Sequence, residues 1–179
     1  MAILPIRSLP DPVLRRKAKR VGIIGNSVQK LIDDLLETMH AVPGRVGLAA
    51  PQVGVSLRVI VIDIPEEEDI VLINPELVRT KGEQLVDEGC LSLQGYGAEI
   101  KRAESVIVKG LDRNGKKIRI KGDGLLAQAL QHEIDHLNGT IYVDHLESMD
   151  KLHKIESGEV THESRGFEVE EASGEQTPL

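Results

Sequence analysis

The chain has 179 residues, a net charge of −7 and only three aromatic side chains, so one domain with an aliphatic core is expected. No apolar run approaches the roughly 18 residues needed to span a bilayer. The charge is concentrated in residues 156–179, which hold seven acids and one base. The remainder carries −1 and lacks the basic stripe of a nucleic-acid binder.

The only cysteine, Cys90, excludes an intrachain disulfide and suits a reducing compartment. Pro5 and Arg7 interrupt the short apolar start of the chain, so neither a signal peptide nor a transit peptide is predicted. We therefore expect a cytoplasmic protein with no membrane segment.

The first half of the chain predicts a helix followed by strands. Asn26-Ser27 can cap a helix that runs to about Met39, because apolar side chains recur there with helical spacing. Residues 58–64 are rich in β-branched side chains and predict a strand buried on both faces. Residues 70–78 predict a second strand, ended or bulged at Asn74-Pro75.

The second half predicts a hairpin and a second helix. Residues 104–121 alternate in polarity on either side of a turn at 112–115. Asp123 can cap a helix over residues 124–138, with Gly139 just past its end. We predict an α+β fold in which largely antiparallel sheets pack around this second helix.

The second helix carries the strongest chemical signal, the segment QHEIDH at 131–136. His132 and His136 are four positions apart, so both imidazoles project from one helix face and can bind a single ion. Glu133 lies beside them, within reach of a water on that ion. Two solvated histidines would give the same pair, so a metal site requires a third ligand.

Cys90 is the best candidate for the third ligand, since a thiolate binds zinc or ferrous iron strongly. The alternative for an isolated cysteine is a small buried hydrophobe. The third histidine of one protease class is absent, because Tyr142 stands at its position. One cysteine and two histidines leave a coordination position open, which is typical of a catalytic site.

Three segments resemble the signature motifs of peptide deformylases, in the right order: GLAAPQVG at 47–54, EGCLS at 88–92 and QHEIDH at 131–136. The resemblance covers roughly residues 1–150 and implies a deformylase catalytic domain of bacterial or organellar type. Composition predicts that residues 151–179 form an acidic, partly disordered tail.

The resemblance implies that Cys90, His132 and His136 bind one divalent ion, ferrous iron, for which zinc, nickel or cobalt can substitute. The implied reaction removes the N-formyl group from the initiator methionine of newly made polypeptides. A metal-bound water attacks the formyl carbon, and Glu133 takes its proton and later delivers it to the departing amine. The side-chain amide of Gln52 and the backbone N–H of Leu91 then hold the oxyanion together with the metal.

Substrate contacts are predicted in the same region. Gly47 belongs to a tight loop of small residues, and Val46 and Ala129 are expected to wall the methionine pocket, although both also suit a plain core. Arg45 stands where the family's first motif usually begins with glycine, which places it at the substrate groove. Gln94 replaces a proline that is common in the second motif.

Two alternatives stay open on these residues: a metallopeptidase that cuts internal peptide bonds, and a metal-binding module in which Arg45 closes the site. Formyl-methionyl peptides are the expected partners, with a transient ribosome contact in addition. Because ribosomal RNA repels acidic segments, such a contact is not expected to use residues 156–179.

Overall fold

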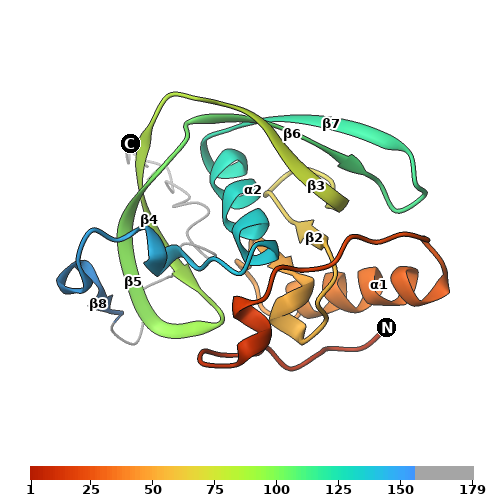
Figure 1. The fold of residues 1–179 in the computed structure, drawn as a ribbon, viewed down its shortest axis with the longest axis horizontal. Coiled ribbons are helices and arrows are strands. Elements are labelled where there is room, and N and C mark those ends of the chain that lie inside the picture. The colour runs from red at the N-terminus through yellow and green to blue at the C-terminus, as the bar shows by residue number, and fades with distance from the viewer. Residues whose placement is uncertain (156–179) are drawn as a thin grey trace, which may run out of the picture.

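The computed structural model describes residues 1–155, which form an α+β fold with two antiparallel sheets around a central helix (Figure 1). The larger sheet has the strand order β1-β2-β3-β6-β7, and the smaller sheet has the order β4-β5-β8. The strands are β1 (Gly47–Ala49), β2 (Val59–Ile62), β3 (Ile70–Lys81), β4 (Gln84–Cys90), β5 (Leu93–Arg102), β6 (Ser105–Leu111), β7 (Lys117–Asp123) and β8 (His153–Lys154).

Two α-helices accompany the sheets, α1 (Asn26–His40) and α2 (Gly124–Leu137). Short 3-10 helices are η1 (Pro12–Arg15), η2 (Ala50–Val53), η3 (Tyr142–His145) and η4 (Met149–Lys151). Within residues 1–155, no helix combines the length and the apolar character needed to cross a membrane.

Both faces of β2 are buried in the core, as the sequence predicted. Ile60 and Ile62 pack with Leu130 of α2, whereas Val59 and Val61 pack against α1 on the opposite face of the sheet. In Figure 1, α2 lies between the larger sheet and the β4-β5 hairpin. One face of α2 therefore completes the core while another meets the smaller sheet.

The predicted helices and hairpin are confirmed, with differences at the ends of elements. Helix α1 begins at Asn26 itself, so its N-cap is Gly25 and the predicted Asn26-Ser27 cap is wrong. Of the two predictions for Asn74-Pro75, the bulge is confirmed, because the register of β3 with β6 shifts there, whereas the strand does not end and continues to Lys81. The two strands of the predicted hairpin are β6 and β7.

The smaller sheet was not predicted, because the sequence analysis assigned no element to residues 79–103. Strands β4 and β5 form a hairpin there, and β8 pairs with β5 through Lys154 opposite Tyr96. The predicted boundary at residue 150 stays a prediction. Residues 151–155, which it assigned to the tail, include β8, and residues 156–179 lie outside the described part of the chain.

Candidate metal centre

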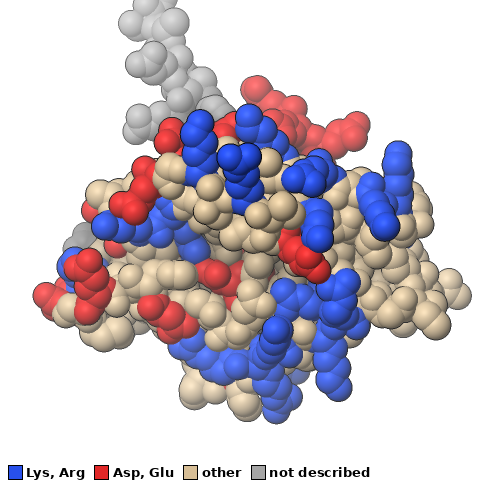
Figure 2. Space-filling model, turned by 45° about the horizontal axis from the view of Figure 1, so that its top comes forward, with Lys and Arg blue, Asp and Glu red and all other residues tan. Residues whose placement is uncertain are grey.

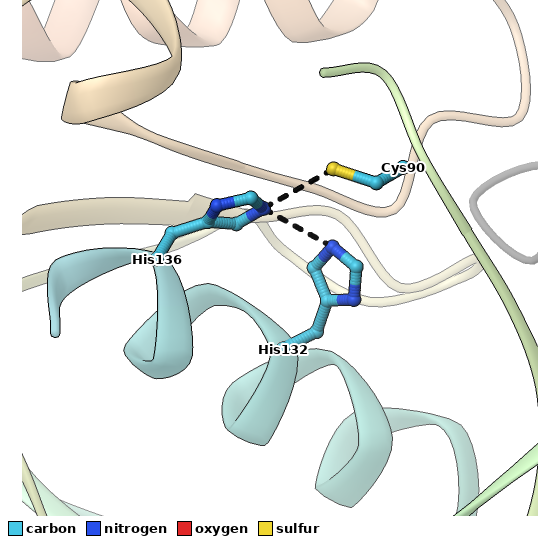
Figure 3. Close-up of side chains that lie close together, drawn as sticks. All are labelled: Cys90, His132 and His136. Atoms are coloured by element: carbon cyan, nitrogen blue, oxygen red, sulfur yellow. Dashed lines mark hydrogen bonds between the residues drawn. The ribbon is translucent and has the colours of Figure 1, made fainter. Parts of the chain in front are cut away.

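Cys90, His132 and His136 come together as the sequence analysis predicted (Figure 3). The Nε2 atom of His136 lies 3.3 Å from the sulfur of Cys90 and 3.3 Å from Nε2 of His132. The three donor atoms all lie within 4.8 Å of one another, and all three side chains are buried. Segments more than forty positions apart in sequence thus bring two nitrogens and one sulfur to one point.

Their elements explain this convergence. Cys90 is the last residue of β4, and the two histidines occupy successive turns on one face of α2. One thiolate and two imidazoles, converging in a buried place, are a donor set that suits zinc or ferrous iron. The residues therefore fit the single divalent ion that the sequence predicted.

Glu88 fixes the orientation of His132, a contact that the sequence analysis did not anticipate. Its Oε1 lies 2.6 Å from Nδ1 of His132, which leaves Nε2 of the ring directed at Cys90 and His136. Arg102 donates two hydrogen bonds of 2.7 Å to the same carboxylate. Burial raises the pKa of Glu88, but the hydrogen bonds from Arg102 and His132 outweigh it and hold that pKa well below its usual range.

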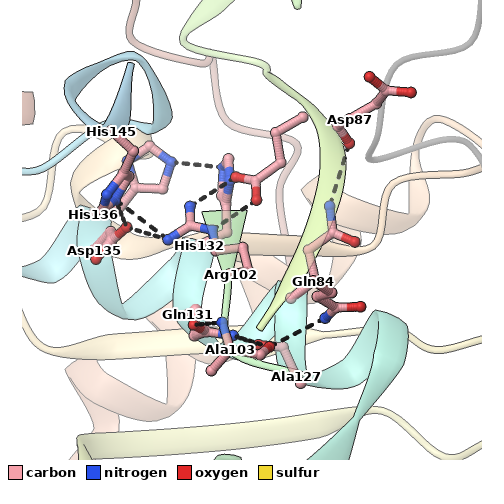
Figure 4. Close-up of polar contacts among 12 residues, drawn as sticks. Gln84, Asp87, Arg102, Ala103, Ala127, Gln131, His132, Asp135, His136 and His145 are labelled. Atoms are coloured by element: carbon pink, nitrogen blue, oxygen red, sulfur yellow. Dashed lines mark hydrogen bonds and ion pairs between the residues drawn. The ribbon is translucent and has the colours of Figure 1, made fainter. Parts of the chain in front are cut away.

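The charged network continues outward from Arg102 (Figure 4). Its Nη1 donates to Asp135 at 2.6 Å, and Asp135 lies 2.8 Å from Nε2 of His145. Burial raises the pKa of Asp135, yet His145 and Arg102 together lower it. The chain of contacts ties β4, β5, α2 and η3 to His132, a predicted metal ligand. The only sequence signal that could have pointed to Glu88 is its position two residues before Cys90.

Glu133 lies against Gly47, the first residue of β1. A Cβ atom at residue 47 would stand 2.6 Å from Oε1 and 2.9 Å from Cγ of Glu133, closer than real Cβ atoms come. Glu133 is buried on the helix turn that carries the two histidines. Only glycine at position 47 leaves room for this carboxylate beside the predicted ligands.

Gln52 reaches the same centre from η2. Its Oε1 accepts a hydrogen bond from the Ala49 backbone N–H at 3.0 Å, so its amide nitrogen points the other way. That nitrogen lies 3.6 Å from the sulfur of Cys90 and 3.4 Å from Oγ of Ser92. Leu91 and Ser92 form the turn that joins β4 to β5, which places the Leu91 backbone directly after the predicted sulfur ligand.

The other predicted positions lie in the core or contact neighbouring elements. Val46 and Ala129 are buried in the core between α2 and the larger sheet. Arg45 donates to the backbone carbonyl of Thr38 in the last turn of α1, at 2.5 Å. Tyr142 stacks on the His132 ring with 6.4 Å between ring centres, and its hydroxyl donates to the Tyr96 carbonyl at 3.1 Å. Tyr142 thus packs beside a ligand.

The chain is similar to known proteins over most of its length. A sequence model of the polypeptide deformylase family matches residues 3–152. A peptide deformylase of Dehalococcoides mccartyi is 58% identical over 156 residues, which are 87% of this chain and 93% of the relative. The crystal structure of a Legionella pneumophila peptide deformylase superposes with a TM-score of 0.80 at 51% identity, covering 84% of this chain and 89% of that one.

A peptide deformylase of Ehrlichia chaffeensis, solved in complex with actinonin, gives a TM-score of 0.81 at 40% identity over 84% of this chain and 92% of its own. Relatives of this similarity, matched over nearly their whole length, share the α+β architecture described above. The chain therefore belongs to the polypeptide deformylase family of enzymes.

Proposed function

We propose that the chain is a metal-dependent hydrolase that removes the formyl group from the initiator methionine of newly made polypeptides and releases formate. The observation that carries this proposal is the meeting of Cys90, His132 and His136 with Glu133 beside them. Membership of the family supports the substrate, and the donor set supports a catalytic ion.

The residues of the site have separate parts in the proposed reaction. When bound, the divalent ion lowers the pKa of a water molecule and polarises the carbonyl under attack. Glu133 takes the proton of that water and later gives it to the amine that leaves. The amide nitrogen of Gln52, whose direction Ala49 fixes, and the N–H of Leu91 donate to the oxygen that becomes negative.

We propose ferrous iron as the ion, with zinc, nickel and cobalt able to replace it. A ferrous centre with a thiolate ligand oxidises readily, so the reducing cytoplasm of a bacterial-type cell suits this site. Protein purified without oxygen should contain one iron per chain and should lose formate release on exposure to air. Protein that is purified without oxygen, contains zinc in place of iron and is fully active would overturn the choice of iron.

The proposed roles predict the behaviour of Glu133→Ala. This variant keeps all three ligands, so it should bind the ion normally while formate release from formyl-Met-Ala falls at least a hundredfold. Metal analysis and a formate assay measure the two quantities separately. Hydrolysis at the rate of the parent protein would refute the role of Glu133.

The same assay separates the two alternatives. Cleavage of an unformylated peptide at an internal bond would indicate a metallopeptidase. Binding of formyl-Met-Ala without turnover by fully metallated protein would indicate a module without catalysis.

A further inference from the structure

Strand pairing gathers cationic side chains on the outer face of the larger sheet. Lys117, Arg119 and Lys121 alternate along β7 with Ile118 and Ile120, which pack toward the core. Register then places Lys109 of β6 beside Arg119, and Ile107 beside Lys121. Arg79 lies opposite Ile107 and Lys81 opposite Ser105, so β3 adds two more cations to the same face.

We call these six exposed side chains the basic face: Arg79, Lys81, Lys109, Lys117, Arg119 and Lys121. The acids at outward positions of the same strands are Glu76 and Asp123, so the face carries about four net positive charges. The whole of residues 1–155 carries −1. Positive charge is therefore concentrated on this face of the larger sheet. Figure 2 shows Lys and Arg spread over the side that comes forward.

Most of these cations have no partner within the described part of the chain. Lys109 pairs with Glu76 at 3.2 Å, but none of the other five forms a side-chain hydrogen bond or ion pair with residues 1–155. An open hollow of about 640 Å³ lies beside them. It is lined by Arg79, Lys81 and Lys121, by the hydroxyl residues Thr80 and Ser105, and by the acids Glu104 and Asp123.

We propose that the basic face binds the phosphate backbone of RNA. Cations two positions apart on a strand stand about 7 Å apart, and neighbouring strands add rows about 5 Å away. Such a grid offers several point charges to a chain of phosphates without reading bases. The choice of RNA over other polyanions rests on the proposed function, because newly made polypeptides leave a ribosome whose surface is rich in RNA.

This surface was not visible in the sequence. Residues 116–121, KKIRIK, hold four bases, but the other cations of the basic face lie in two separate stretches, at 79–81 and at 109. Antiparallel pairing of β3, β6 and β7 brings them onto one face. The basic stripe that the sequence lacks is thus assembled by the fold.

The proposal is tested with the full-length protein and a fluorescein-labelled 20-base-pair RNA duplex, by anisotropy at several KCl concentrations. Binding should weaken steeply with salt. The variant K117E/R119E/K121E should lower affinity at least tenfold and reduce the slope of log affinity against log salt by about two to three. R79E/K81E reverses two further charges on β3, which β6 separates from β7, and should also lower affinity.

A matched control carries the same change of charge elsewhere. Arg16, Lys17 and Lys154 are exposed and belong to no ion pair in the described residues, so R16E/K17E/K154E should keep RNA affinity within twofold. Equal loss in this control would overturn the proposal. Hydrolysis of soluble formyl-Met-Ala checks that each variant is folded and should stay unchanged, so failure to bind RNA and failure to deformylate are separate results.

The same titration tests two other occupants of the basic face, the chain's own acidic segment and a membrane surface. A full-length variant with glutamine at the seven glutamates of residues 156–179 should bind RNA within twofold of the parent. RNA binding by that variant alone would assign the basic face to the chain's own acidic segment. Binding of phosphatidylserine vesicles that is as tight as RNA binding, and is lost in K117E/R119E/K121E, would assign it to a membrane surface.

Discussion

Gly47 makes room for Glu133, because the Glu133 carboxylate occupies the space that a side chain at residue 47 would need. The prediction that Gly47 belongs to a tight loop is wrong, because it lies in the buried strand β1, where it makes room for the predicted general base. The proposed chemistry therefore depends on a residue that brings no functional group of its own.

Gly47→Ala should displace Glu133 and lower formate release by about 10- to 100-fold, since misplacing a reacting group by about 1 Å can cost that much. Metal content should be unchanged, because no ligand moves with residue 47. Gly22→Ala is the matched control, since nothing lies within 4 Å of a Cβ added there. Equal activity in the two variants would show that Glu133 tolerates the displacement.

At the scale of elements, one arginine joins three of them. Arg102 of β5 contacts Glu88 of β4 and Asp135 of α2, and its side chain is only 3% exposed. Two carboxylates and one guanidinium are satisfied together, and one of the carboxylates holds His132. The orientation of a predicted metal ligand therefore depends on how the smaller sheet docks against α2.

Arg102→Met should destabilise the protein by about 3–5 kcal/mol, because it leaves the buried carboxylate of Glu88 without its cation. It should also weaken metal binding by about 10- to 100-fold through the looser His132 ring. Urea unfolding and a metal titration measure these effects. Lys101→Met, at an exposed neighbour paired only with Glu83, should cost no more than about 1 kcal/mol. Similar losses in both variants would contradict the proposed network.

The elements that could be predicted from the sequence are those whose residue pattern lies within one short stretch of the chain. Helix α1 follows from apolar spacing, and the β6-β7 hairpin follows from alternation around a turn. Strands β4 and β5 were missed because four glycines interrupt residues 79–103 and because residues that pack with them, such as Leu14 and Tyr142, are distant in sequence. The ligands could be named from their motifs, whereas Arg102 is 14 positions from Glu88 and 33 from Asp135, separations that no local pattern spans.

At the scale of the molecule, the candidate ion would tie the smaller sheet to α2, because Cys90 comes from β4 and the histidines from the helix. Removing it with a chelator should lower the unfolding temperature by roughly 5–10 °C, as expected for about 2–3 kcal/mol of binding free energy in a domain of this size. Differential scanning calorimetry measures the shift.

Cys90→Ser should reduce that shift to a small fraction of the parent value. An undiminished shift in the variant would mean that the stabilising ion binds elsewhere. The exposed group formed by His40, Asp63 and Asp69 is where it would then be sought.

Forty-six positions separate the sulfur ligand from the last imidazole. A ribosome adding about 5–20 residues per second needs roughly 2–9 s to cover that distance. For most of this interval the thiol of Cys90 exists without either histidine, and the second histidine comes only at its end, so loading has to wait until the helix is made. Oxidant stress during synthesis, more than stress on the finished enzyme, would then decide what fraction of chains ever acquires its ion.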